Sequence, residues 1–336
     1  MFMRRMRSFL LLLGSAMLGA CHLVEVEHSP VIAKSNESVT FTANAHTGAA
    51  YEMKIWVNNL VVKTCTASPC VYTGGPYPAY QGSTVSYKAT LHITSTCSLF
   101  CDGTDGANQF AITDTSYGYP TPYIPARVTG STSSKEDLVF HKATDYAANG
   151  STFSVFLGHV KNKIFNVLGA QDIVDHNLSN FNFWVYNKDA TSGGCGTVHS
   201  DASTDMPWRD DDAVLHFENF QDCTNGGLSH FSAEGTNTKA FLHESGHAVF
   251  GLADEYCGTT SYFQPSVEPN IWSGLASCQA EQTAKGRNPA ACYQFCANQG
   301  GWKGIHTGTT VMTNGMVGDP WFTEADEHVR WFFNNI

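Results

Sequence analysis

Two histidines and a glutamate within one short segment could hold and use a metal ion. His243 and His247 are four residues apart, and Glu244 directly follows the first histidine. In a helix this spacing puts both imidazoles on one face, where they can bind a single Zn²⁺ ion. Glu244 could then act as a general base on a water molecule at the metal. The alternative is a chance HExxH match on a surface helix, but the ordered sequence that follows favours a site.

A catalytic zinc needs a third protein ligand, and the residues after this segment offer candidates. Gly251 can end the helix by adopting a positive φ, after which the chain presents Asp254. Asp254 is the predicted third ligand. Glu255 is the nearest alternative, and His230 and His306 are distant ones. Asp254 could instead accept a hydrogen bond from a ligand histidine and orient its ring.

The elements that must position these residues can also be predicted. Asn237 and Thr238 provide an N-cap for a helix over about residues 238–250, with Phe241 and Val249 packed inward. Upstream, apolar residues at helical spacing predict a helix over residues 153–168.

Two segments before the metal motif predict strands, 181–186 and 213–217. Residues 226–231 are typical of a loop that leads into an edge strand near the site. Alternating helices and strands predict an α/β zinc domain over residues 137–336.

The preceding part of the chain is rich in β-forming residues. Residues 53–57 and 60–62 flank Asn58-Asn59, which predicts a hairpin. Similar segments recur between turn residues, so we expect an all-β, immunoglobulin-like sandwich over residues 24–115. Residues 116–136, rich in Thr, Ser, Pro and Gly, are predicted to form a linker. The predicted fold is therefore multidomain.

Composition narrows the possible partners. The chain has 336 residues, of which 42% are hydrophobic, and its formal net charge is −11. The size allows one large or two ordinary domains. There is no basic stripe to neutralise phosphates, so we expect no nucleic-acid partner.

The N-terminus has the features of an export signal. Three arginines precede an apolar stretch over residues 9–18, which predicts a signal peptide over residues 1–20. The segment 18–21, Leu-Gly-Ala-Cys, is similar to the bacterial lipobox, in which the cysteine is acylated. Cys21 is therefore the predicted lipidation site, which would anchor an exported bacterial protein to the membrane at the cell envelope. The alternative is secretion with cleavage near Ala20.

The cysteine count agrees with export. The chain has eleven cysteines, and setting Cys21 aside leaves ten, an even number that suits disulfides. Three local pairs are suggested by position: Cys65 with Cys70, Cys97 with Cys101, and Cys195 with Cys223. The remaining four permit three pairings, and sequence does not choose among them: Cys257, Cys278, Cys292 and Cys296.

The motif His-Glu-Ser-Gly-His, followed by Leu-Ala-Asp-Glu-Tyr, resembles the bacterial IgA metalloendopeptidase family, which is metzincin-like. The similarity covers roughly residues 137–336 and is strongest over 228–322. Further matching segments are 181–185, 229–234, 268–270 and 310–312.

The resemblance implies a zinc endopeptidase with His243 and His247 as ligands and Glu244 as the base. It also implies that Met312 is the Met-turn methionine beneath the metal, although an ordinary core methionine would fit as well. The broader pattern HExxHxxGxxH is not met. Asp254 stands eleven residues after His243, where that pattern has a histidine at ten, and this leaves the third ligand open.

The predicted function is thus exported, zinc-dependent peptide-bond hydrolysis with one catalytic ion and a protein or peptide substrate. The alternative is a surface-anchored binding or adhesion module whose zinc domain is inactive or acts on a non-peptide amide. Nothing in the residues indicates immunoglobulin as the substrate, and the oligomeric state is open.

Overall fold

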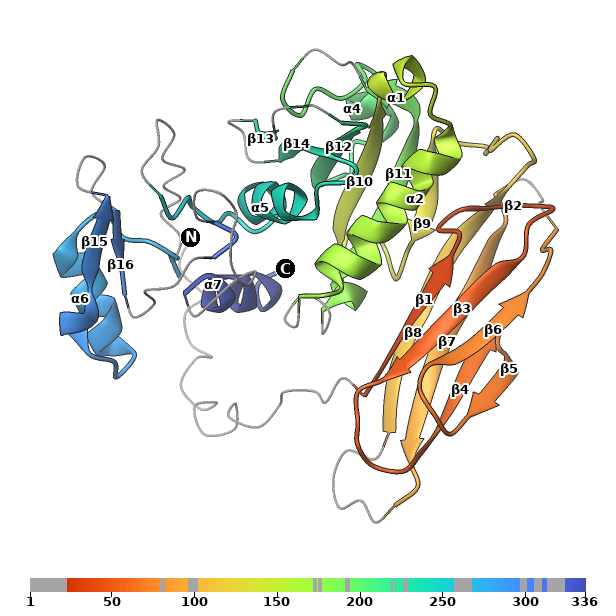
Figure 1. Ribbon diagram of the computed structural model, residues 1–336, viewed down its shortest axis with the longest axis horizontal. Coiled ribbons are helices and arrows are strands. Elements are labelled where there is room, and N and C mark those ends of the chain that lie inside the picture. Colours follow the sequence, from red (N-terminus) through yellow and green to blue (C-terminus); the bar gives the residue numbers. More distant parts are fainter. Residues whose placement is uncertain are drawn as a thin grey trace, which may run out of the picture.

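Strand-rich sheets come first along the chain, and an α/β region with a parallel sheet follows (Figure 1). The computed structural model describes residues 23–78, 82–95, 102–171, 174, 177–190, 194–218, 220, 222–225, 229–256, 268–296, 301–304, 310–312 and 324–336. The mixed α/β architecture predicted from the sequence is confirmed.

The N-terminal part consists of a three-stranded sheet, ordered β1-β3-β6, and a five-stranded sheet, ordered β2-β8-β7-β4-β5. Buried and partly exposed residues alternate along β1 and β3, as expected for strands with one face on a core. The inner faces of both sheets contribute to one apolar cluster. The strands are β1 (Val24–Ser29), β2 (Ala33–Lys34), β3 (Val39–Ala45), β4 (Tyr51–Val57), β5 (Leu60–Cys65), β6 (Cys70–Gly74), β7 (Thr84–Ile93) and β8 (Asp102–Thr113).

The predicted hairpin is confirmed between β4 and β5. Asn58 and Asn59 have φ values of 49° and 64°, and asparagine tolerates this left-handed region better than most residues. The disulfide Cys65–Cys70 joins the end of β5 to the start of β6.

The α/β region is built on a six-stranded sheet, ordered β13-β14-β12-β10-β11-β9. Strands β11, β10, β12 and β14 are parallel, and each edge strand is antiparallel to its neighbour. All six residues of β12 are buried, which is expected where helices or loops cover both faces of a parallel sheet. The strands are β9 (Tyr123–Arg127), β10 (Glu136–Ala143), β11 (Phe181–Ala190), β12 (Asp211–His216), β13 (Cys223–Thr224) and β14 (His230–Glu234).

One face of this sheet packs against two helices. The predicted helix over 153–168 is confirmed as α2 (Phe153–Lys161), which continues as a π-helical segment, η1 (Asn162–Leu168). The second helix is α5 (Thr238–Ala248), and Phe156, Ile164 and Phe241 lie in the same core cluster.

The other face of the sheet is covered by the segment that carries α4 (Ala202–Asp205). Trp184 and Tyr186 pack there with Met206. Two further short helices belong to the region, α1 (Asp145–Ala148) and η2 (Leu178–Asn180).

The predicted edge strand near residue 230 requires a correction. β14 is an inner strand, because β13 pairs with it on the outer side through Cys223↔Ser232 and Thr224↔Phe231. Two residues, Cys223 and Thr224, are enough to make β13 the edge, which period-2 patterning cannot detect. Residues 226–228 lie outside the described residues.

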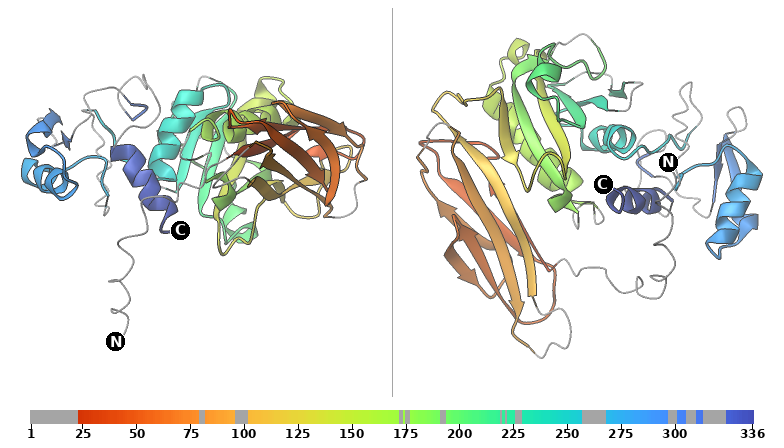
Figure 2. Two further views of the ribbon diagram at one scale, coloured as in Figure 1. Left: turned by 90° about the horizontal axis from the view of Figure 1, so that it is seen from below. Right: turned by 180° about the vertical axis from the view of Figure 1, so that it is seen from behind.

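A small lobe follows the metal motif (Figure 2). It contains α6 (Leu275–Ala284), the 3₁₀ turn η3 (Pro289–Ala291), and the hairpin β15 (Tyr293–Cys296) with β16 (Gly301–Lys303). The disulfide Cys278–Cys292 closes it. Lys285 and Arg287 pair with Glu327 of the last helix, α7 (Glu324–Phe333).

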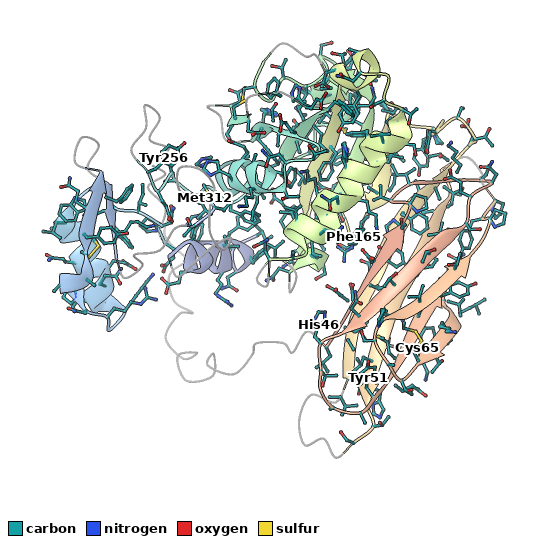
Figure 3. The ribbon with its side chains drawn as sticks, in the orientation of Figure 1. His46, Tyr51, Cys65, Phe165, Tyr256 and Met312 are labelled. Atoms are coloured by element: carbon teal, nitrogen blue, oxygen red, sulfur yellow. A yellow bond between two sulfur atoms is a disulfide. The ribbon has the colours of Figure 1, made fainter. Side chains whose placement is uncertain are left out.

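The N-terminal sheets and the α/β region share a buried interface. Arg127 on β9, 1% exposed, pairs with Asp105 on β8 and donates a hydrogen bond to the Leu178 carbonyl. Phe165 of η1, labelled in Figure 3, packs edge-on against His28 of β1. The segment predicted as a linker, 116–136, contains β9 and thus an edge of the α/β sheet.

The structure agrees with an exported protein. The disulfides Cys65–Cys70 and Cys195–Cys223 join the predicted pairs, and Cys278 is bonded to Cys292. Disulfides persist in oxidising compartments. Among the described residues, no helix combines the length and apolar character needed to cross a membrane. The predictions for Cys21, Cys97, Cys101 and Cys257 concern residues outside the described part of the chain.

Candidate metal centre

Helix α5 carries the two histidines, and specific residues fix each of its ends. The Asn237 side chain accepts a hydrogen bond from the Ala240 backbone N–H at 3.0 Å, as the predicted N-cap requires. Lys163, fully buried, donates to the Asn237 carbonyl at 2.8 Å. At the other end, Gly251 has a φ of 70°, which lets the chain turn back past the helix. The helix is therefore fixed at both termini.

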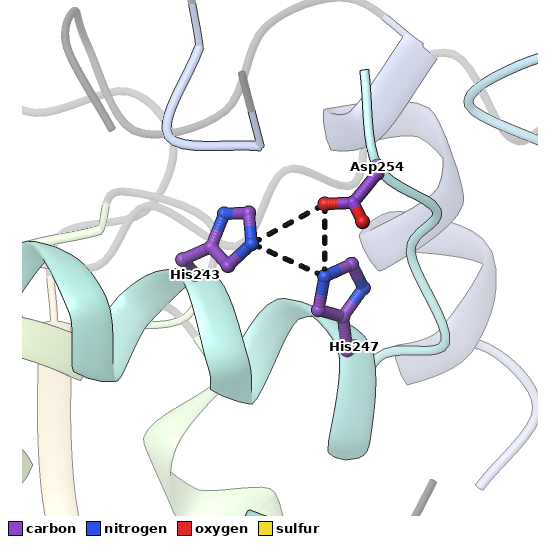
Figure 4. Close-up of side chains that lie close together, drawn as sticks. All are labelled: His243, His247 and Asp254. Carbon is purple, nitrogen blue, oxygen red and sulfur yellow. Dashed lines mark hydrogen bonds and ion pairs between the residues drawn. The ribbon is translucent and has the colours of Figure 1, made fainter. Parts of the chain in front are cut away.

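The two imidazoles and the Asp254 carboxylate converge on one point (Figure 4). His243 Nε2 lies 3.2 Å from His247 Nε2, and Asp254 Oδ1 lies 3.3 and 3.1 Å from these atoms, respectively. All three side chains are buried. Three atoms bound to a tetrahedral Zn²⁺ at 2.0–2.1 Å would be about 3.3 Å apart. The triangle therefore has the dimensions of a zinc ligand set.

The opposite ring nitrogens determine what the three atoms can do. His243 Nδ1 contacts the Val311 carbonyl and His247 Nδ1 the Leu252 carbonyl, both at 2.7 Å. A carbonyl only accepts hydrogen bonds, so each Nδ1 carries a proton and a neutral ring has a bare Nε2. Three lone pairs, including that of Asp254 Oδ1, then face one another. A positive charge must lie among them, either a proton on one imidazole or a metal ion.

The electrostatics of the cluster reflect the same need for positive charge. Burial alone would lower the pKa of His243, but the Asp254 carboxylate, the Glu244 charge and the Val311 carbonyl outweigh burial and raise it. Burial would raise the pKa of Asp254, yet its hydrogen bonds with His243 and His247 hold that pKa below its usual range. The site thus favours an anionic carboxylate beside a cation.

Asp254 is held in place by its neighbours in the chain. The Asn270 side chain accepts from the Ala253 N–H at 3.0 Å and donates to the Ala253 carbonyl at 2.8 Å. Its Nδ2 also donates to Glu255 Oε1 at 3.3 Å. These bonds fix the Ala253 backbone before Asp254 and hold the Glu255 side chain after it, so the carboxylate does not need to be ordered when an ion binds.

Glu255, the nearest alternative ligand, points elsewhere. Its carboxylate forms a buried ion pair with Lys303 at 2.5 Å and accepts a hydrogen bond from Thr310 at 2.8 Å. The Glu255 N–H donates to the Met312 carbonyl at 2.8 Å. Glu255 therefore connects the ligand loop to β16 and to residues 310–312, while Asp254 faces the histidines.

His230, a more distant alternative, lies on the other face of the sheet. Successive side chains of a strand point to opposite faces, and Phe231 packs against Phe241 of α5. His230 therefore faces away from α5, where its Nδ1 lies 2.8 Å from buried Asp212. His306 lies outside the described residues.

Met312 packs against the metal helix. It is fully buried, and a Cβ added at Gly246 would lie 2.6 Å from its Sδ. Figure 3 shows Met312 beside α5. Because Val311 holds His243 and Met312 contacts Gly246, residues 310–312 support the helix under the site.

Glu244 lies next to His243 and is 5% exposed. Its Oε2 accepts a hydrogen bond of 2.6 Å from the Thr224 hydroxyl on β13. Burial raises the pKa of Glu244, although the His243 charge and the Thr224 hydrogen bond act in the opposite direction. A carboxyl with a raised pKa is suited to accepting a proton.

Three supporting residues were not predicted from the sequence: Thr224, Lys303 and Asn270. Asn270 forms two hydrogen bonds with the Ala253 backbone, which we call the Asn270 clasp. Asn270 did fall within a segment that matched the suspected family, but its role was not predicted. Thr224 and Lys303 have no local signal, since each is at least 20 residues from its partner. Only the tertiary fold brings them to the site.

The residues present fit a divalent metal ion. Two imidazole nitrogens and a carboxylate oxygen are typical zinc donors. The second Asp254 oxygen, Oδ2, is buried and accepts no hydrogen bond from the described residues, although buried carboxylate oxygens usually have partners. The His243, His247 and Asp254 group can therefore hold a metal ion.

Comparison with known proteins adds no family assignment. No protein-family model matches the chain, and a search of curated proteins found no match. Function must therefore be inferred from the geometry of the site.

Proposed function

We propose that this protein is an exported zinc endopeptidase of the bacterial IgA metalloendopeptidase type. In this proposal the N-terminal sheets form an immunoglobulin-like sandwich, the α/β region is metzincin-like, and a lipid on Cys21 anchors the chain at the cell envelope. The support is the helix with two convergent imidazoles, the carboxylate of Asp254 and the adjacent base. The motif resemblance adds the peptide substrate.

In this proposal each residue of the site has a separate role. His243, His247 and Asp254 hold the ion, and their partners Val311, Leu252 and the Asn270 clasp keep the ligand atoms convergent. Zinc in such a site supplies Lewis acidity and lowers the pKa of water to about 7.

Glu244 accepts the proton of the attacking water and returns it to the leaving amine. This role is supported by the electrostatic interaction of the Glu244 carboxylate with His243, His247 and Asp254. Glu244 itself is not one of the three grouped ligand residues. No side chain acts as a nucleophile, so no covalent enzyme intermediate forms.

The observation that carries the proposal is the convergence of the lone pairs of His243, His247 and Asp254, with the buried carboxylate of Glu244 nearby. The test is cleavage of casein by wild type, by Glu244→Gln and by chelator-treated protein. We expect Glu244→Gln to bind zinc at one ion per chain and to lose roughly 10²–10⁴-fold in kcat, because general-base catalysis contributes a factor of that size. Chelation should abolish cleavage, and added Zn²⁺ should restore it.

The alternative function is binding at the cell surface. Leu60, Val61 and Val71 are 69, 44 and 46% exposed on strands β5 and β6 of the N-terminal sheets, and exposed apolar residues can mark an interaction site. Equal cleavage, or equal lack of it, in all three samples would reject the peptidase and leave the binding module as the better explanation.

A further inference from the structure

The edge strand β13 reaches the proposed general base. Thr224 is buried, and its hydroxyl lies 2.6 Å from Glu244 Oε2 but 3.3 Å from the Glu244 backbone carbonyl. A hydroxyl has one proton to donate, and the shorter contact to a charged acceptor is the stronger. Thr224 therefore donates to the carboxylate.

This bond occupies Oε2 of Glu244 and leaves Oε1 to accept a proton in the proposed reaction. Glu244 Oε1 accepts no hydrogen bond from the described residues, whereas Oε2 is bound by Thr224. A glutamate side chain loses up to about 2 kcal/mol of rotamer freedom when it is fixed. A residue that fixes it in the folded protein removes that cost from the reaction.

β13 itself is fixed by a disulfide. Cys223, directly before Thr224, is bonded to Cys195. On the Cys195 side, the Gly196 N–H donates to buried Ser232 at 2.9 Å, and Gly196 has a φ of 57° that a larger residue would strain. β13 is thus attached to β14 by its ladder and to residues 195–196 by the covalent bond.

We propose that Thr224 is a positioning residue for Glu244, and that the Cys195–Cys223 disulfide maintains Thr224 in place. This inference rests on the proposed function. Thr224 fixes the carboxylate so that its second oxygen faces the water, and the disulfide prevents a two-residue edge strand from separating from the sheet.

The first test compares Thr224→Val with Thr224→Ser. We expect Thr224→Val to lower kcat about 10- to 100-fold, since a misplaced catalytic group costs on this order, with KM changed less than about twofold and one zinc bound per chain. Thr224→Ser keeps the hydroxyl and should restore most of kcat. Thr224→Ala serves if the valine variant does not fold. Unchanged kcat in the valine or alanine variant would overturn the proposal.

The second test removes the disulfide. Cys195→Ala/Cys223→Ala should lower kcat, and Thr224→Val should then cost clearly less than it does in the wild type, because both changes release the same carboxylate. Cys65→Ala/Cys70→Ala is the matched control, since it removes a disulfide far from the site and should leave kcat unchanged. Multiplicative losses from the two changes would reject the role of the disulfide.

A third measurement separates this inference from the proposed function. In zinc-free protein, Thr224→Val should lower the unfolding midpoint of the wild type more than that of Glu244→Ala, because the contact exists without activity. If wild type shows no Glu244-dependent cleavage but this difference is found, the peptidase fails and the contact stands. If cleavage depends on Glu244 and the difference is absent, only the positioning role fails.

Discussion

At the level of single residues, the site is determined by where each lone pair points. The carbonyls of Val311 and Leu252 each accept a hydrogen bond from one histidine Nδ1–H and thereby turn the two Nε2 atoms toward Asp254. Asp254 and Glu255 are adjacent in the chain, yet one faces the histidines and the other is bound to Lys303. Two adjacent carboxylates therefore have different roles.

Substituting these two acids should separate the roles. Asp254→Ala should weaken zinc binding by more than about 100-fold, since loss of even a hydrogen-bonding partner of a ligand costs roughly 10- to 100-fold. Glu255→Gln should bind zinc within about tenfold of wild type, but lose about 3 kcal/mol of stability because Lys303 stays buried without its counter-charge. Zinc titration against a chromophoric chelator and thermal unfolding measure both. The reverse pattern would make Glu255 the ligand.

Asp137, which accepts a hydrogen bond from Trp184 on the face of the sheet opposite α5, should make stability depend on pH. Burial raises its pKa to about 6, although Trp184 and Asn182 donate hydrogen bonds to it. An acid whose folded-state pKa is raised stabilises the fold below its unfolded-state pKa, about 4, and this contribution is lost as pH rises through 6. Asp137→Asn should therefore gain stability relative to wild type between pH 4 and 7, measured by thermal unfolding of zinc-free protein.

Asp114 provides a control of opposite sign. Hydrogen bonds from the Ser116 hydroxyl and the Gly118 and Ser116 N–H groups lower its pKa. Its stabilising contribution is therefore present above the unfolded-state pKa and lost as pH falls. Asp114→Asn should differ from wild type near neutral pH, and the difference should shrink under acid. If Asp137→Asn followed this same direction, burial would not be the cause of its shift.

At the level of elements, helix α5 is held in place by contacts that are local in the sequence and by contacts that are not. The N-cap and the glycine stop are local, so the sequence predicted the helix correctly. The packing of Met312 on Gly246 is not local, since 66 residues separate them in the sequence. Residues 310–312 contact both the His243 ring and the helix, so a change in this packing should reach the metal ligands.

Gly246→Ala tests that packing. The added Cβ would lie 2.6 Å from Met312 Sδ and 3.2 Å from its Cε. Because both residues are buried, we expect a loss of about 1–3 kcal/mol, together with weaker zinc binding. Gly158→Ala on α2 is the control. Nothing lies within 4 Å of its added Cβ, so this change should stabilise the protein by about 0.5–1 kcal/mol. Equal effects of the two substitutions on unfolding would contradict the packing argument.

At the level of the whole molecule, the sequence was most informative where the signal is short. The metal motif, the N-cap, the Asn58-Asn59 hairpin and the Cys65–Cys70 disulfide depend on residues close in the chain, and the structure has the helix, the hairpin and this disulfide as predicted. The Cys195–Cys223 disulfide, which is also as predicted, joins residues 28 apart. The two-residue strand β13 and the entry of β9 into the sheet could not be predicted. Each depends on pairing with a distant strand. β13 has only two residues, and β9 is buried along four of its five residues, so neither shows an alternating pattern.

The position of β9 predicts how a shortened chain will behave. A fragment of residues 137–336 lacks Ile124 and Ala126, which are fully buried in the α/β core, and also Ile32 from the N-terminal part. Full burial of one isoleucine contributes about 1.5–3 kcal/mol. We expect the fragment to unfold at a clearly lower temperature than the chain without residues 1–20, as followed by circular dichroism. Equal midpoints would show that the α/β region is stable without its neighbour.

The most direct test of the central claim is the position of the metal in crystals of the zinc-loaded protein. An anomalous difference map collected at the zinc absorption edge should show one peak per chain, bonded to His243 Nε2, His247 Nε2 and Asp254 Oδ1, at about 2.0–2.2 Å from each. A peak on any other residues, or fully loaded crystals with no peak among these three atoms, would contradict the account.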